Sequence, residues 1–162
     1  MLKQILLRCL LLLLALPATA NARVVINEIF YHAPNDVDDL EYVELFNDGA
    51  QPVDLTGWAF TKGIKFRFAA GTRIDARGFL VLCRDSARFK EFYGDVPIAG
   101  VFTQHLKKSG KHLQLSDGSG KIVDSVKYQD SAPWPVSPDG HSASLERICP
   151  DVSGENVANW AC

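Results

Sequence analysis

The sequence lacks the short motifs that mark the common enzyme and metal-binding classes. Its 162 residues include four cysteines but no C-x-x-C pair, so a zinc ribbon or a dithiol redox centre has no support. It has no G-x-S-x-G, H-E-x-x-H or P-loop pattern, the usual signatures of serine hydrolases, zinc proteases and nucleotide-binding enzymes. Internal repeats and low-complexity linkers are also missing. The composition excludes collagen-like, coiled-coil and disordered acidic chains, which leaves one globular domain.

Long hydrophobic runs are missing except near the N-terminus. Lys3 and Arg8 precede a leucine-rich stretch at residues 10–16, which is shorter than the ~20 residues that span a bilayer. Small residues follow, with A-x-A patterns that end at Ala20 and Ala22. This order is typical of a secretory signal peptide. The sequence therefore predicts a signal peptide at residues 1–22, cleaved after Ala20 or Ala22, and export to the periplasm or the extracellular medium.

A basic excess is missing as well. Removal of residues 1–22 leaves about 140 of the 162 residues. It also removes two of the 17 basic residues, so the mature chain has 15 basic and 19 acidic residues. The net charge of the mature chain is about −4, which argues against binding nucleic acid through bulk charge. We expect a monomer with no membrane span in the mature chain, built from a single domain at residues 23–162.

Three cysteines remain after removal of the signal peptide, an odd number in an oxidising compartment. Cys149 and Cys162 bracket a short C-terminal segment whose Pro150 and Gly154 allow it to double back. A disulfide there would stabilise the fold by about 3 kcal/mol in the chain-entropy model. Cys83 ends an apolar run and is expected to be a small buried thiol.

Most of the remaining chain has the pattern of short strands. In residues 64–68, apolar and basic side chains alternate with the period of a half-buried strand. Turn residues at 117–120 lie between two such runs and predict a hairpin. The predicted strands are Val24–Tyr31, Glu41–Asn47, Gly57–Thr61, Ile64–Phe68, Phe79–Arg84, His112–Leu115, Lys121–Tyr128 and Ser142–Arg147. One short helix is expected after Asp85 or Ser86, ending at Gly94. These elements predict an all-β, two-sheet sandwich with one short helix.

The order of motifs along the chain resembles the lamin tail domain family in its bacterial secreted form. The motifs that carry this resemblance are Val25–Ile29, Glu41–Asn47, Val53–Trp58, Phe66–Phe68, Gly78–Leu82, Leu106–Gly110, Leu113–Leu115, Val123–Val126, Ala132–Pro135, Ser144–Arg147 and Asn159–Trp160. The resemblance implies an immunoglobulin-like β-sandwich. It also implies a non-catalytic module that binds or positions a partner, because family members in exported bacterial proteins often accompany hydrolase, nuclease or surface domains.

An acidic loop is the main candidate ligand site. Asp36, Asp38, Asp39 and Glu41 provide four carboxylates in a short stretch, the hard oxygen donors that calcium prefers. The spacing is not that of an EF-hand, and a solvated acidic turn is the competing interpretation. Glu28 and Glu44 on the flanking strands could add ligands if they face each other. No other cofactor is expected.

A basic turn and a tryptophan form a second candidate surface. Lys107, Lys108 and Lys111 surround a Ser-Gly pair and could contact phosphates, anionic lipid or an acidic polysaccharide. Trp134 lies between two prolines, which suggests a rigid exposed ring that could stack on a sugar. The competing interpretations are a solvated turn for the lysines and core packing for the tryptophan.

An enzyme has little support. The four histidines are not spaced as ligand pairs, and we expect each at the surface or at an edge. Asp139, His141 and Ser142 could form a triad only on paper, because triad members normally come from separate segments. The sequence therefore predicts an exported, non-catalytic binding or scaffolding module with a protein, cell-envelope or polysaccharide partner. The alternatives are a calcium-dependent carbohydrate- or envelope-binding module and, less favoured, a small secreted hydrolase.

Overall fold

A computed structural model describes residues 23–162, so the predicted signal peptide at residues 1–22 lies outside the described part of the chain. The strands are β1 (Val24–Phe30), β2 (Tyr42–Asn47), β3 (Val53–Asp54), β4 (Ala59–Lys62), β5 (Phe66–Arg67), β6 (Arg73–Ile74), β7 (Phe79–Cys83), β8 (Ile98–Val101), β9 (Lys111–Ser116), β10 (Ile122–Tyr128), β11 (Leu145–Arg147) and β12 (Trp160–Ala161). The helices are α1 (Ser86–Tyr93) and three 3-10 turns, η1 (Pro34–Asp36), η2 (Asp38–Leu40) and η3 (Val157–Asn159). The predicted all-β class with one short helix is confirmed.

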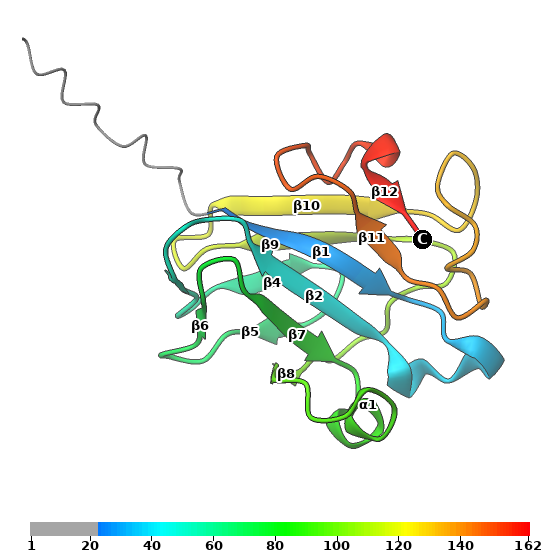
Figure 1. Cartoon of the computed structure of the whole chain (residues 1–162), viewed down its shortest axis with the longest axis horizontal. Helices are drawn as coiled ribbons and strands as arrows, with labels where there is room; N and C mark the ends of the chain where they lie inside the picture. The colour runs from blue at the N-terminus through cyan, green and yellow to red at the C-terminus, as the bar shows by residue number, and fades with distance from the viewer. Residues whose placement is uncertain (1–22) are drawn as a thin grey trace, which may run out of the picture.

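Two sheets stack as a sandwich (Figure 1). The larger has the order β12-β11-β1-β2-β7-β8 and the smaller the order β10-β9-β4-β5. In β2, Val43 and Leu45 are buried while Glu44 is only half-buried, the alternation expected where one face of a strand meets the core. The parallel pairing of β8 with β7 is the exception in otherwise antiparallel sheets. The chain passes from β7 to β8 through α1, the kind of crossover connection that parallel neighbours need.

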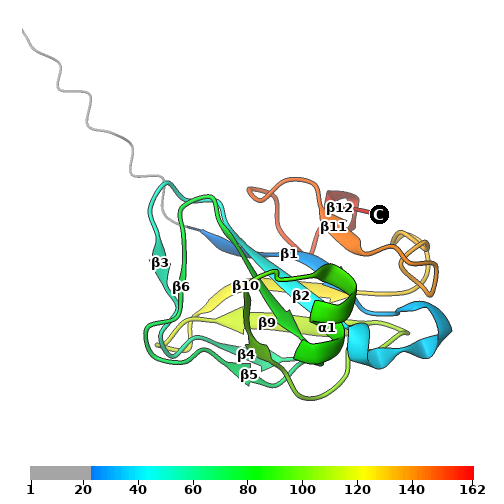
Figure 2. The ribbon, with the colours of Figure 1, turned by 60° about the horizontal axis from the view of Figure 1, so that its bottom comes forward.

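The hairpin predicted at residues 117–120 is confirmed as the link between β9 and β10. The Asp117 carboxylate organises it, accepting hydrogen bonds from the backbone N–H groups of Ser119 and Lys121 at 2.9 and 3.0 Å. The small β3–β6 sheet lies at one end of the sandwich, away from α1 (Figure 2). Two-residue strands of this kind carry no period, and for this reason the sequence pattern missed them.

Helix α1 begins and ends where the sequence predicts. The Asp85 carboxylate accepts hydrogen bonds from the backbone N–H groups of Ala87 and Arg88, both at 2.9 Å, which makes Asp85 the N-cap. Gly94 ends the helix with a φ of 75°, a conformation that favours glycine. No helix within residues 23–162 has the length and hydropathy of a transmembrane span.

Aromatic residues fill the space between the sheets. Tyr31 and Tyr128 are fully buried and stack with ring centroids 4.8 Å apart. Trp134 is only 7% exposed and packs against Trp160 at 6.1 Å. The interpretation of Trp134 as an exposed sugar-stacking ring is therefore wrong. Trp134 belongs to the core cluster, where the indole gains more from leaving water than it could on the surface.

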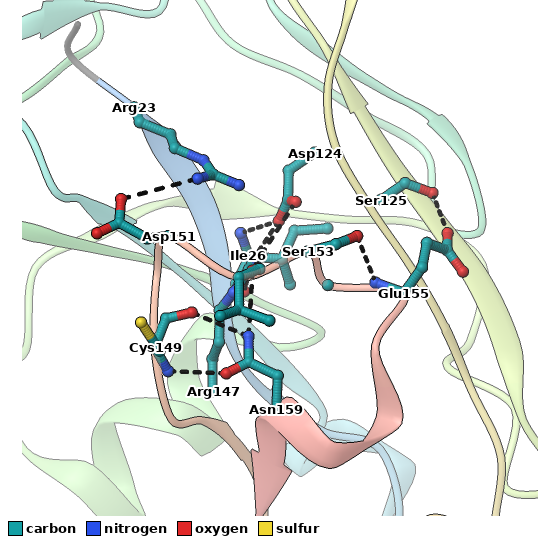
Figure 3. Close-up of polar contacts among 12 residues, drawn as sticks. Arg23, Ile26, Asp124, Ser125, Arg147, Cys149, Asp151, Ser153, Glu155 and Asn159 are labelled. Atoms are coloured by element: carbon teal, nitrogen blue, oxygen red, sulfur yellow. Dashed lines mark hydrogen bonds and ion pairs between the residues drawn. The ribbon is translucent and has the colours of Figure 1, made fainter.

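A buried ion pair joins the two sheets where β10 of the smaller sheet meets β11 and β1 of the larger one (Figure 3). Arg147 in β11 donates to Asp124 in β10, from Nη1 to Oδ2 at 2.6 Å and from Nη2 to Oδ1 at 3.4 Å. Asp124 Oδ2 also accepts the backbone N–H of Ile26 at 2.8 Å. The remaining Nη contacts of Arg147 go to the carbonyls of Ile26 and Val152. Both oxygens of the carboxylate have a donor, which offsets the cost of burying the charges, although Arg147 Nε has no partner among the described residues.

The C-terminal segment is anchored by an asparagine. In the structure Cys149, Cys162 and Cys83 are free thiols, so the predicted Cys149–Cys162 disulfide is not formed there. Instead the Asn159 side chain accepts from the backbone N–H of Cys149 and donates to its carbonyl, both at 2.9 Å. The pairing of β12 with β11 adds backbone hydrogen bonds at the same place. Cys83 is buried, as expected.

Candidate functional site

A basic hollow of about 430 Å³ lies where the β8–β9 loop meets the end of the β9–β10 ladder. Its lining residues are Gly63, Lys107, Ser109, Gly110, Lys111, His112, Lys127, Tyr128 and Gln129. Three are lysines and one is a histidine, and none is an acid. We call this feature the basic hollow. Two of the three lysines predicted as a ligand surface, Lys107 and Lys111, line it.

Strand register brings two of the basic side chains of the hollow, Lys127 and His112, together. Lys127 in β10 is paired with His112 in β9, and Tyr128 is paired with Lys111. Cross-strand partners lie about 5 Å apart on one face, so Lys127 and His112 share a surface, whereas Lys111 and the buried Tyr128 belong to the opposite face of the ladder. Lys127 was missed by the sequence reasoning, although its position opposite His112 follows once the hairpin register is fixed.

Close backbone packing shapes the wall of the hollow. A Cβ atom at Gly110 would lie 2.5 Å from the Tyr128 carbonyl oxygen, and Gly110 has a φ of 106°. Any side chain there would force the β8–β9 loop away from β10. The Tyr128 hydroxyl donates to the Lys107 carbonyl at 3.1 Å and holds the other side of the same loop.

The charges of the hollow are only partly neutralised. Burial lowers the pKa of Lys111, and Lys107 lowers it further, while Glu41 opposes both effects. The Lys111 ammonium donates to the backbone carbonyl of His105. His112 Nε2 is 2.8 Å from the Ser125 hydroxyl, and that hydroxyl donates to Glu155 at 2.6 Å. Lys107 and Lys127 are exposed, so the hollow presents positive charge toward solvent, while Glu41 and Glu155, the acidic partners of Lys111 and His112, lie outside the lining.

A second cluster lies beside the basic hollow and contains part of the predicted calcium loop. Asp38, Glu41 and His105 bring one ligand atom each within 4.8 Å of the others. Nδ1 of His105 is 3.4 Å from Asp38 Oδ2 and 3.8 Å from Glu41 Oε2. We call these three residues the Asp38–Glu41–His105 cluster. Side chains three residues apart in a 3-10 turn lie in line, which is how η2 places Asp38 beside Glu41.

Glu41 is the most unusual residue of the cluster. It is 1% exposed, yet its Oε1 has no hydrogen-bond partner among the described residues. Its Oε2 accepts the backbone N–H of Leu106 at 3.0 Å. Burial raises the pKa of Glu41 to about 8, against the lowering effect of the Leu106 hydrogen bond. Such a group sits in the fold at a free-energy cost unless something compensates its charge.

The other predicted ligands do not join this cluster. Asp39 is exposed and is not part of the cluster, and the side chain of Asp36 lies outside the described part of the structure. Glu28 and Glu44 do face each other across β1 and β2, but they lie on the sheet and outside the cluster. The calcium loop thus stays a prediction, now with two of its four carboxylates placed together and a histidine beside them.

The histidines have partners that the sequence did not indicate. His105 comes to Asp38 and Glu41 from a loop distant in the chain, after Gln104, whose φ is 68°. No spacing rule could have found this approach, because a loop sets it and a regular element does not. Asp139, a member of the triad considered on paper, is 2.6 Å from Nδ1 of His32.

Comparison with known proteins identifies the family. A search among curated proteins found no match. A family model described as Lamin Tail Domain matches residues 17–130, which is more than half of the chain. The matched range includes the basic hollow and the Asp38–Glu41–His105 cluster, whereas β11 and β12 follow it and complete the same sheet as β1. The chain belongs to the lamin tail domain family, whose immunoglobulin-like sandwich the sequence predicted.

Proposed function

We propose that this protein is an exported, non-catalytic binding module that attaches to anionic polysaccharide of the cell envelope through the basic hollow. The observation that carries the proposal is the lining of the hollow, with three lysines, one histidine and no acidic residue. The immunoglobulin-like character of the family supports a binding or scaffolding role. The signal peptide predicted at residues 1–22 supports export.

The charge distribution favours a local anionic ligand over a general polyanion. The mature chain carries more acidic than basic residues, so the whole molecule repels polyanions while the hollow attracts them. Lysine ammonium groups act as point charges that suit carboxylate or phosphate groups. A volume of about 430 Å³ falls within the range of small-ligand sites, which suits one or two charged sugar units.

The test is a binding measurement with polymers of defined charge. Alginate supplies carboxylates on a polysaccharide, a phosphorylated mannan supplies phosphates on one, and neutral dextran supplies neither. We expect binding to one of the charged polymers and none to dextran. Binding to dextran, or to no polymer, would overturn the proposal.

Matched variants connect the binding to the hollow. Lys107→Ala and Lys127→Ala each remove a charge from the lining and are expected to weaken binding about tenfold or more, because hydrogen bonds to charged groups contribute 1.5–3 kcal/mol. Lys121→Ala is the control, because this exposed lysine lies at the hairpin end of the same ladder and outside the lining. Equal effects at all three positions would show non-specific attraction and contradict a built site.

A further inference from the structure

We propose that Asp38, Glu41 and His105 bind a divalent transition-metal ion of the zinc class. This proposal does not rest on polysaccharide binding, because none of the three residues lines the basic hollow. The two features are neighbours, since Lys111 of the hollow acts electrostatically on Glu41 and donates to the His105 carbonyl. It also departs from the calcium loop that the sequence predicts, since a histidine takes the place of two of the carboxylates.

The distances between the ligand atoms suit a small tetrahedral ion. Atoms held ~2.1 Å from a tetrahedral zinc ion lie ~3.4 Å from one another. Nδ1 of His105 is 3.4 Å from Asp38 Oδ2 and 3.8 Å from Glu41 Oε2. Small side-chain adjustments would therefore complete three corners of the tetrahedron.

A second observation is that the buried carboxylate of Glu41 is incompletely partnered, since Oε2, the atom 3.8 Å from His105, accepts the Leu106 N–H while Oε1 has no hydrogen-bond partner among the described residues. Glu41 is 1% exposed and its Oε1 has no hydrogen-bond donor among residues 23–162. A buried carboxylate normally has a donor or a cation at each oxygen. Arg84 and Lys111 act on this carboxylate through space, and a metal ion would add a positive charge bound directly to it.

The donor set selects the class of ion. One imidazole nitrogen and two carboxylate oxygens are the ligands of zinc-class sites, whereas calcium and magnesium prefer oxygen donors alone. Asp38 is 41% and His105 is 51% exposed at the side chain, so an ion there can reach solvent. Three protein ligands leave a fourth position open for water or for a ligand atom.

Two cations lie beside these ligands: Lys108 competes with the ion for Asp38, whereas Arg84 faces the ring nitrogen of His105 that the ion would not use. The Lys108 ammonium is 3.6 Å from Asp38 Oδ1, and Nη2 of Arg84 is 3.4 Å from Nε2 of His105. Both contacts are long for charge-assisted hydrogen bonds, and Lys108 is 38% exposed at the side chain. Removal of Lys108 should therefore strengthen metal binding.

The test is a cobalt and zinc titration of chelator-treated protein, followed by calorimetry and by the visible absorption of bound cobalt. Cys149→Ser and Cys162→Ser are introduced together in every sample, because the accessible thiols could bind either metal. We expect one ion per chain and the absorption of a tetrahedral cobalt site, with no binding of calcium at the same concentration. No binding in this background, or calcium binding equal to zinc binding, would overturn the proposal.

The test uses variants of the two partly exposed ligands, because their substitution should not prevent folding as a change at the buried Glu41 could. His105→Gln and Asp38→Asn are expected to weaken binding more than ~10-fold, since loss of even an outer partner has that effect. His141→Gln, at an exposed histidine outside the cluster, is the control and should leave binding unchanged. Lys108→Gln should tighten binding about two- to fivefold, as expected for removal of a surface charge. Unchanged binding in His105→Gln would contradict the site.

Discussion

Two nearly buried carboxylates in this molecule have opposite surroundings. Asp124 is 7% exposed, and its two oxygens accept two contacts from Arg147 and one from the backbone N–H of Ile26 (Figure 3). Glu41 is 1% exposed, and one of its oxygens has no donor. Asp124 is thus held as an ion pair inside the fold, whereas Glu41 is buried without a full set of partners.

The difference separates a structural group from a candidate functional one. The Asp124–Arg147 pair joins β10 to β11 and β1, and nothing about it requires a ligand. Glu41 lies at the end of η2 beside two partly exposed residues that can reach solvent. An unsatisfied atom alone does not mark a functional site, because Arg147 Nε also lacks a partner among residues 23–162; what distinguishes Glu41 is a solvent-accessible histidine and a second carboxylate beside it.

Removal of the Asp124 carboxylate should produce the largest effect. Asp124→Ala leaves the Arg147 guanidinium buried and without its counterion, which is expected to lower the free energy of unfolding by about 3–5 kcal/mol. Urea denaturation measures the change. Asp124→Leu combined with Arg147→Met should be less harmful than Asp124→Ala, because no unpaired charge remains. A loss below 1 kcal/mol in Asp124→Ala would contradict the structural role of the pair.

Glu41, in contrast to Asp124, should destabilise the fold when it is ionised, so the stability should depend on pH. Its pKa is about 8 in the folded chain and 4.5 ordinarily, so between these values the folded state retains a proton that the unfolded state has lost. The contribution of Glu41 to the free energy of unfolding is therefore fully present below about pH 4.5. It is lost as the pH rises to about 8, which lowers the free energy of unfolding by about 2–4 kcal/mol in total.

Glu41→Gln removes this titration and should flatten the pH profile, so that the variant is more stable than the parent at about pH 8. The measurement is urea denaturation in the presence of a chelator over that range. A parent protein whose stability rises over the same range would show that Glu41 has a compensating partner.

Charges at the rim of both regions should matter least for stability. The side chain of Glu155, near the Arg147 region, is 48% exposed, and that of Lys108, near Glu41, is 38% exposed. Glu155→Gln and Lys108→Gln are each expected to change the free energy of unfolding by less than ~1 kcal/mol. A larger loss of stability in either variant would show that the surface charge is part of the neighbouring buried network.

The sequence predicted the parts of the fold that have a period or a strong local preference. Alternation in β2, the turn residues at 117–120 and the cap at Asp85 each act over a few neighbouring residues, and the structure confirms all three. The strands β3, β6, β8 and β12 were missed because they are short and exist only through pairing with distant partners.

The candidate site could be predicted only in part for the same reason. Asp38 and Glu41 were found because they are close in sequence, and Lys107 and Lys111 because they belong to one turn. His105 and Lys127 were not, since a loop and a strand register bring them to the site. Burial of Trp134 also depends on its contact with Trp160, which no local pattern shows.

The most direct test of the proposed function is the salt dependence of binding to the charged polymer. If the basic hollow holds the ligand, the dissociation constant should rise steeply with salt concentration, because screened charges attract less strongly. Lys127→Ala should make that dependence shallower, and Lys121→Ala should leave it unchanged. A dependence that is the same in the parent and in Lys127→Ala would contradict recognition through the basic hollow.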